Sequence, residues 1–121
     1  MKNLSYIFTV LTLFLFGCSG FLYWDKPALQ FSEIDYGYPT KTVLDDPKIA
    51  YIDQGSGEQT IILVHGLARN AGFWRYNIPE LSKKYRVITV DLPGYGKSQK
   101  GDYAYSMSFY ADQIQKLIES L

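Results

Sequence analysis

Residues 91–98, which read DLPGYGKS, hold the residue types that most directly suggest chemistry. Glycines followed by Gly96-Lys97-Ser98, directly after the apolar run 87–90, are typical of a loop that wraps nucleotide phosphates with its backbone amides. Such a loop starts with a glycine where this chain has Asp91, and it runs straight into a helix whose N-terminus faces the phosphate. Asp91 would repel a phosphate, and turn-forming residues follow Ser98. The sequence therefore argues against a phosphate-binding loop.

A second stretch, His65-Gly66-Leu67, follows the apolar run 60–64. Ligands of open α/β sheets bind at the carboxyl ends of the strands. A glycine at such an end lets the backbone turn tightly and leaves amides free to stabilise an oxyanion during acyl transfer. The simpler interpretation is that His65 and Gly66 only end a strand, with His65 hydrogen-bonded in a loop.

The elements that must position these stretches are two apolar runs, 60–64 and 86–90, which we expect to be parallel strands buried on both faces. Segments 42–44 and 48–53 predict an antiparallel pair at the sheet edge. Residues 106–121 carry apolar side chains at three- and four-residue steps, the pattern of an amphipathic helix. This order of strands and helices predicts an α/β sheet.

The segment between the two apolar runs is long enough for a helical crossover. Asn77, Pro79 and Glu80 form a helix-start pattern, with Asn77 as the cap. We expect the strand at 86–90 to form an unpaired apolar edge, which would make the isolated chain poorly stable.

The motifs also follow one another in a specific order. Along the chain stand His65-Gly66, Phe73-Trp74-Arg75, Ile78-Pro79-Glu80-Leu81, Tyr85-Arg86-Val87-Ile88 and DLPGYGKS at 91–98. This set resembles the N-terminal half of the α/β-hydrolase-fold family, which includes esterases, lipases and epoxide hydrolases. The resemblance covers roughly Lys48 to Leu121.

The resemblance implies a role for the His65-Gly66 stretch. In this family the residue after the glycine supplies one amide of the oxyanion hole, here the backbone of Leu67. His65 and Gly66 would then position the loop, and His65 would not be the catalytic base, which lies near the C-terminus of family members. No residue of this chain is assigned as catalytic through its side chain.

The resemblance also gives the 91–98 stretch a structural role. It would be the family's loop after the fourth strand, in which Gly94 and Gly96 permit a sharp turn and Asp91 orders the backbone. Trp74 is a candidate for the substrate pocket, although packing in the core is the alternative for so large an aromatic side chain.

The family's nucleophile lies in a Gly-x-Ser-x-Gly turn, and no such pentapeptide occurs here. The family pattern places that turn shortly beyond the helix at 106–121. We therefore expect the N-terminal part of a hydrolase for ester or related acyl bonds, inactive as the 121-residue chain alone. Family members with aspartate in that turn act on epoxides or haloalkanes, so serine and aspartate both stay open. The alternative is a truncated, non-catalytic lipoprotein that serves as a binding or structural module.

Composition narrows the function further. The chain has 12 basic and 12 acidic residues, so no net charge points to nucleic acid. One histidine and one cysteine exclude a zinc cluster of such residues and an intrachain disulfide. No cofactor or metal is expected, and the expected partners are a small ester-like substrate and a membrane.

The N-terminus reads as a targeting segment. Lys2 precedes an apolar stretch at 4–16, and the run ends in Leu15-Phe16-Gly17-Cys18, which resembles a bacterial lipobox with Cys18 as the lipidated residue. We expect a signal peptide at 1–17, a spacer at 18–40 and the hydrolase part at 41–121, exported and anchored outside the membrane. An uncleaved anchor and an ordinary signal peptide are the alternatives.

Overall fold

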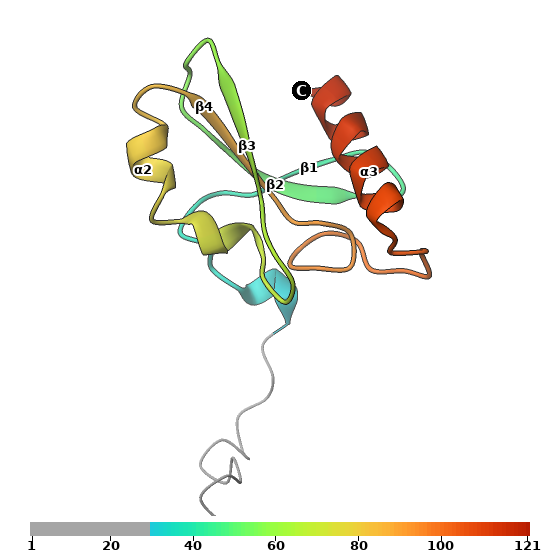
Figure 1. The fold of residues 1–121 in the computed structure, drawn as a ribbon. Coiled ribbons are helices and arrows are strands. Elements are labelled where there is room, and N and C mark those ends of the chain that lie inside the picture. The colour runs from blue at the N-terminus through green and yellow to red at the C-terminus, as the bar shows by residue number, and fades with distance from the viewer. Residues whose placement is uncertain (1–29) are drawn as a thin grey trace, which may run out of the picture.

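The computed structural model describes residues 30–121 as a four-stranded mixed sheet with helices on both faces (Figure 1). The elements are η2 (Phe31–Glu33), β1 (Lys41–Val43), β2 (Ile49–Gln54), β3 (Thr60–Val64), η3 (Ala71–Trp74), α2 (Ile78–Leu81), β4 (Arg86–Val90) and α3 (Met107–Ser120). The strand order is β1-β2-β4-β3, with β1–β2 and β2–β4 antiparallel and β3–β4 parallel. The predicted α/β class, with antiparallel strands followed by a parallel pair, is confirmed.

The central strand of this sheet is β4, because β2 and β3 flank it. Two expectations were therefore wrong. β4 is not an edge strand, and β3 is not buried on both faces, since it lies at the edge of the described sheet and Val64 is 40% exposed. A run of β-branched residues predicts a strand but does not say which strands become its neighbours.

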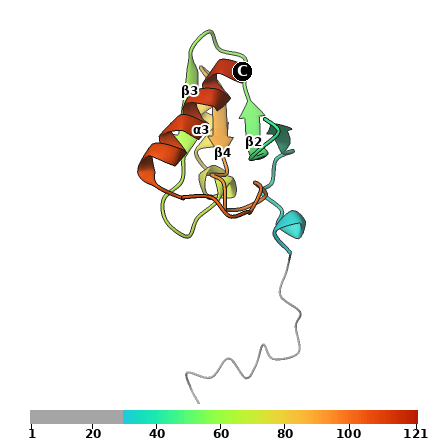
Figure 2. The same ribbon diagram turned by 90° about the vertical axis from the view of Figure 1, so that its right-hand side faces the viewer.

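The core lies on both faces of the sheet because side chains of β2 and β4 alternate between them. One face carries Tyr36, Ile52, Ala71, Ile78 and Val87, and the other carries Ile49, Tyr51, Ile88, Val90 and Leu117. Helix α3 covers the second face, as the turned view shows (Figure 2), whereas η3 and α2 lie on the first.

The crossover between β3 and β4 contains less helix than predicted. It holds two short turns, η3 and α2. Asn77 stands at the N-terminal position of α2 but its backbone is helical (φ −88°, ψ −32°) and its side chain makes no capping bond. Glu80 instead pairs with Lys83 at 2.6 Å, so the expected cap does not form.

Helix α3 follows the predicted range 106–121 closely. The Ser106 hydroxyl accepts the Phe109 N–H at 3.1 Å, which satisfies one of the amides left free at a helix start. The apolar stripe of α3 packs Leu117 fully into the core.

The folded unit begins earlier than the expected boundary between 40 and 41. Tyr36 is 1% exposed, and Ile34 and Tyr38 pack against the same cluster. The end of the expected spacer is therefore part of the fold. The expected signal peptide and Cys18 lie outside the described residues. Within residues 30–121, no helix is long and apolar enough to cross a membrane.

Candidate functional site

The Asp91 carboxylate is the polar centre of the site region. It is fully buried and accepts three hydrogen bonds, from the Tyr36 hydroxyl at 2.8 Å, the Ala71 N–H at 2.6 Å and the Lys97 N–H at 2.7 Å. These donors compensate for the loss of water around the charge. Burial, and then the neighbouring Asp91 charge, raise the pKa of the Tyr36 phenol. The carboxylate thus joins the segment before β1, the start of η3 and the loop after β4.

The loop after β4 is also tied to strand β2. The Ser98 hydroxyl donates to the Asp91 carbonyl at 2.6 Å and accepts the Ala50 N–H at 2.7 Å. The Asp91 N–H donates to the Ala50 carbonyl at 2.9 Å. Ser98, which had suggested a phosphate loop, therefore extends the pairing of β4 with β2 by one more rung.

Two glycines of this loop have conformations that require glycine. Gly94 has φ +88° and Gly96 has φ +47°. A Cβ on Gly96 would overlap the Asp91 carboxylate, and one on Gly94 would lie 2.8 Å from the Tyr105 ring. The backbone passes this close to Asp91 and Tyr105 because no side chain intervenes.

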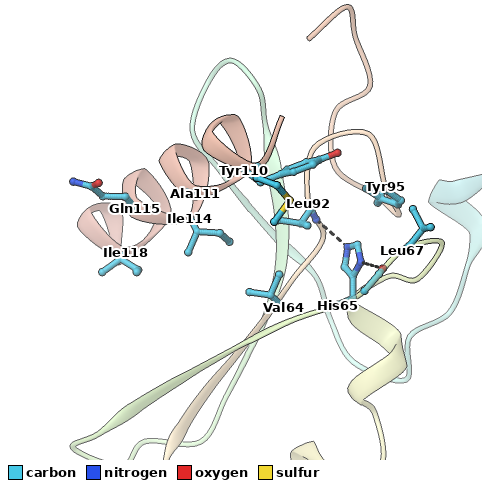
Figure 3. Close-up of a pocket in the computed structure, with 12 residues that line it drawn as sticks. Val64, His65, Leu67, Leu92, Tyr95, Tyr110, Ala111, Ile114, Gln115 and Ile118 are labelled. Atoms are coloured by element: carbon cyan, nitrogen blue, oxygen red, sulfur yellow. Dashed lines mark hydrogen bonds between the residues drawn. The ribbon is translucent and has the colours of Figure 1, made fainter. Parts of the chain in front are cut away.

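His65 joins the loop after β3 to the loop after β4 (Figure 3). The Leu92 N–H donates to Nε2 of His65 at 3.1 Å, so Nε2 carries no proton. Nδ1 then carries the proton and donates it to the Gly66 carbonyl at 2.9 Å. The buried ring also packs edge-on against Tyr95, with centroids 5.2 Å apart. Both ring nitrogens are used to hold the two loops.

Leu67 lies at the tip of the turn that His65 supports. Leu67 is 86% exposed, and the Arg69 N–H closes the turn by donating to the Gly66 carbonyl at 3.3 Å. Ala68, the next residue, has φ +55°. Among residues 30–121 the Leu67 N–H has no hydrogen-bond acceptor. An amide left free at the carboxyl end of a strand is the kind of donor that stabilises an oxyanion.

A cavity of about 650 Å³ opens beside this turn, between the end of β3 and α3 (Figure 3). Its walls are mostly apolar and comprise Val64, His65, Gly66, Leu67, Leu92, Tyr95, Met107, Tyr110, Ala111, Ile114, Gln115 and Ile118. Trp74 is not among them. It is half-buried in η3 on the other face of the sheet, against Phe73. The structure therefore brings His65, Gly66 and Leu67 together with the cavity and leaves Trp74 away from it.

Several site residues were not predicted from the sequence. Tyr36 lies 55 positions before Asp91, and no local pattern joins the two. Tyr95 and Tyr105, which lie near Leu67, come from a turn-rich stretch without periodicity. Tyr110 lies in α3, so only for this tyrosine could the amphipathic pattern of the sequence have given the position. The described residues contain no cluster of three side chains able to hold a metal ion.

Comparison with known proteins agrees with this geometry. The model of the alpha/beta hydrolase fold family matches residues 59–121, more than half of the chain. A pimeloyl-[acyl-carrier protein] methyl ester esterase from Edwardsiella ictaluri is 46% identical over 60 residues, which are 50% of this chain and 23% of the esterase. A 2-hydroxy-6-oxo-6-(2'-aminophenyl)hexa-2,4-dienoic acid hydrolase from Metapseudomonas resinovorans is 36% identical over 74 residues, covering 59% of this chain and 25% of the hydrolase.

Solved structures give the same result. A probable hydrolytic enzyme from Pseudomonas aeruginosa PAO1 superposes with a TM-score of 0.64 at 34% identity, over 73% of this chain and 31% of that enzyme. The chain spans about a quarter of the length of the curated relatives it matches. Since the family model matches more than half of the chain, the chain belongs to the α/β-hydrolase fold family.

Proposed function

We propose that this segment belongs to an enzyme that hydrolyses ester or related acyl bonds, and that it supplies one oxyanion-hole donor, the Leu67 N–H. The observation that carries the proposal is this amide, which has no acceptor among residues 30–121 and stands on an exposed turn at the end of β3. The name of the esterase relative, which acts on a methyl ester, supports an ester as substrate.

The proposed reaction follows the nucleophile–histidine–acid scheme of the family. The nucleophile oxygen attacks the acyl carbon while the base histidine takes its proton, and the carbonyl oxygen gains negative charge. The Leu67 N–H donates to that oxygen. The base then returns the proton to the departing alcohol, and water hydrolyses the acyl-enzyme to release the carboxylic acid. His65 takes no part in proton transfer in this scheme, because both of its nitrogens hold loops.

The test uses the full-length gene product and p-nitrophenyl esters. Leu67→Pro removes the N–H, and Leu67→Ala keeps it while removing the same exposed side chain. We expect Leu67→Pro to lower kcat by about a hundredfold or more and Leu67→Ala to leave it within about threefold. Thermal unfolding of both variants controls for misfolding. Equal activity of the two variants would exclude this amide as the donor.

The nucleophile is tested separately with a fluorophosphonate probe on the full-length product. Covalent labelling identifies a serine, whereas opening of an epoxide without labelling points to an aspartate. If the product is not labelled and hydrolyses no ester, the proposed function is contradicted.

We also propose that the enzyme is exported and tethered to a membrane through Cys18. The support is the sequence alone, with Lys2, the apolar stretch and the lipobox-like residues before Cys18. Growth of expressing bacteria with labelled palmitate should label the wild type in the membrane fraction and leave Cys18→Ser unlabelled. Equal labelling of both would rule out lipidation at Cys18.

A further inference from the structure

A second cavity, also of about 650 Å³, opens on Leu67 from the side of the loop after β4. It shares Leu67, Tyr95 and Tyr110 with the apolar cavity beneath α3 and adds lining residues from the loop after β4. Tyr105 completes its aromatic wall. Three tyrosines from two different segments thus converge beside the amide to which the oxyanion is assigned.

The backbone of Tyr105 has an unfavourable conformation. Its φ of +48° lies in the left-handed region, which bulky residues rarely adopt. The hydroxyl donates to the Gly101 carbonyl at 2.7 Å and accepts the Gly101 N–H at 3.2 Å, so the side chain closes its own loop. Gly94 leaves the space that the ring fills. Strain retained at a cavity wall, with several contacts to maintain it, indicates a functional position.

The rings are arranged so that a further aromatic group can pack among them. The centroids of Tyr105 and Tyr110 are 6.2 Å apart with planes inclined at 37°, and those of Tyr95 and Tyr110 are 6.5 Å apart at 50°. Such tilted rings expose both faces and edges, which attract the edges and faces of another ring.

Lys100 also lines the cavity, but its ammonium is held elsewhere. It donates to the carbonyls of Gly96 at 2.6 Å and Ser98 at 3.0 Å and stands 4.4 Å from the centre of the Phe31 ring, and Phe31 and Gly96 line a different cavity. The groups that characterise the wall are therefore the neutral tyrosine rings.

We propose that this aryl pocket, formed by Tyr95, Tyr105 and Tyr110, binds an aromatic group of the ester substrate while the ester carbonyl reaches the Leu67 N–H. The proposal rests on the proposed function for the position of the carbonyl. The pocket itself rests on the three rings and on the strained backbone of Tyr105.

The test is equilibrium binding of two uncharged ketones, benzylacetone and its cyclohexyl analogue, to the full-length product by NMR titration. The ketones have the same carbonyl and nearly the same size, and only the first has an aromatic ring. We expect benzylacetone to bind about fivefold more tightly. Tyr110→Leu should reduce this preference to less than twofold, and Tyr110→Phe, which keeps the ring, should retain it.

Tyr105→Leu provides a second ring deletion at a more exposed position, in case Tyr110→Leu does not fold. It too should lose the preference. Equal affinity for the two ketones in the wild type, or an unchanged preference in a folded ring-deletion variant, overturns the proposal.

Hydrolysis of phenylpropanoate and cyclohexylpropanoate methyl esters separates this proposal from the proposed function. If both esters are hydrolysed at equal kcat/KM and both ketones bind equally, the aryl-pocket proposal is excluded and the proposed hydrolase function stands. If Tyr110→Leu abolishes a ketone preference but no ester is hydrolysed, the proposed hydrolase function is excluded and the aryl pocket stands.

Discussion

The Tyr36 hydroxyl donates to the Asp91 carboxylate at 2.8 Å across 55 residues of chain. Both side chains are fully buried, and the same carboxylate holds the backbone of Ala71, four residues after Leu67, and of Lys97. The turn that presents the free Leu67 amide and the loop that faces it are thereby fixed to one buried anion.

Asp91→Asn should destabilise the protein by about 2–3 kcal/mol, because one of the two carboxylate oxygens becomes an NH2 that faces N–H and O–H donors. Tyr36→Phe removes a single donor and leaves both oxygens, so a cost of about 1 kcal/mol is expected. Urea unfolding followed by circular dichroism measures both. A smaller loss for Asp91→Asn than for Tyr36→Phe would show that the carboxylate is not the centre of the network.

Gly96→Ala should cost about 2 kcal/mol or more, because it adds an overlap with Asp91 to the strain of a positive φ. Gly37→Ala is the matched control. Gly37 also has a positive φ (+76°), but no atom lies within 4 Å of the added Cβ, so only a cost of about 1 kcal/mol is expected. If the two variants unfold at the same urea concentration, overlap with Asp91 has no energetic effect.

The neutral His65 ring should carry its proton on Nδ1, since Nε2 must accept from Leu92. Long-range proton–nitrogen NMR correlation distinguishes the two tautomers. His65→Ala should lower kcat by disturbing the Leu67 turn while the fluorophosphonate probe still labels the nucleophile. An Nε2–H spectrum would contradict the assignment.

Stability should depend on pH through Asp53. Arg86 donates to both carboxylate oxygens of Asp53 at 3.1 Å and, with Lys41 at 2.9 Å, holds the pKa of Asp53 below its usual range. A carboxyl whose pKa is lower in the folded state stabilises the fold above the unfolded pKa of about 4 and loses that contribution as the pH falls through the folded value.

Asp53→Asn should therefore be less stable than the wild type at pH 7, by about 1 kcal/mol because the pair is partly exposed to solvent. The difference should shrink in acid. Urea midpoints measured from pH 7 down to pH 3 give the comparison, and a difference that stays constant over this range would show that Asp53 does not contribute through its charge.

The strands could be predicted from the sequence because the signal is local. The β-branched runs predicted β3 and β4 with the bounds that the structure has, Thr60–Val64 and Arg86–Val90. Their order in the sheet could not be predicted in this way. The pairing of β2 with β4 depends on a register over residues 51–54 and 87–90 that no single segment encodes.

The site shows the same division. The resemblance to the hydrolase family singled out the Leu67 amide, whereas His65 and Gly66 alone were also consistent with a simple strand end. The contacts that fix this amide come from Leu92, Ala71 and Asp91, which only the folded sheet brings together. Trp74 was a candidate for the pocket with packing in the core as the alternative, and the residue type does not tell which face of a sheet a side chain reaches.

The long reach of the Tyr36–Asp91 bond makes the site depend on a segment that precedes every strand of the sheet. Without Tyr36, the buried carboxylate that holds the backbone of Ala71 and Lys97 would lose one of its three donors. Proteolytic removal of the segment through Tyr36 should therefore weaken the anchor of the Leu67 turn while leaving all four strands in the chain.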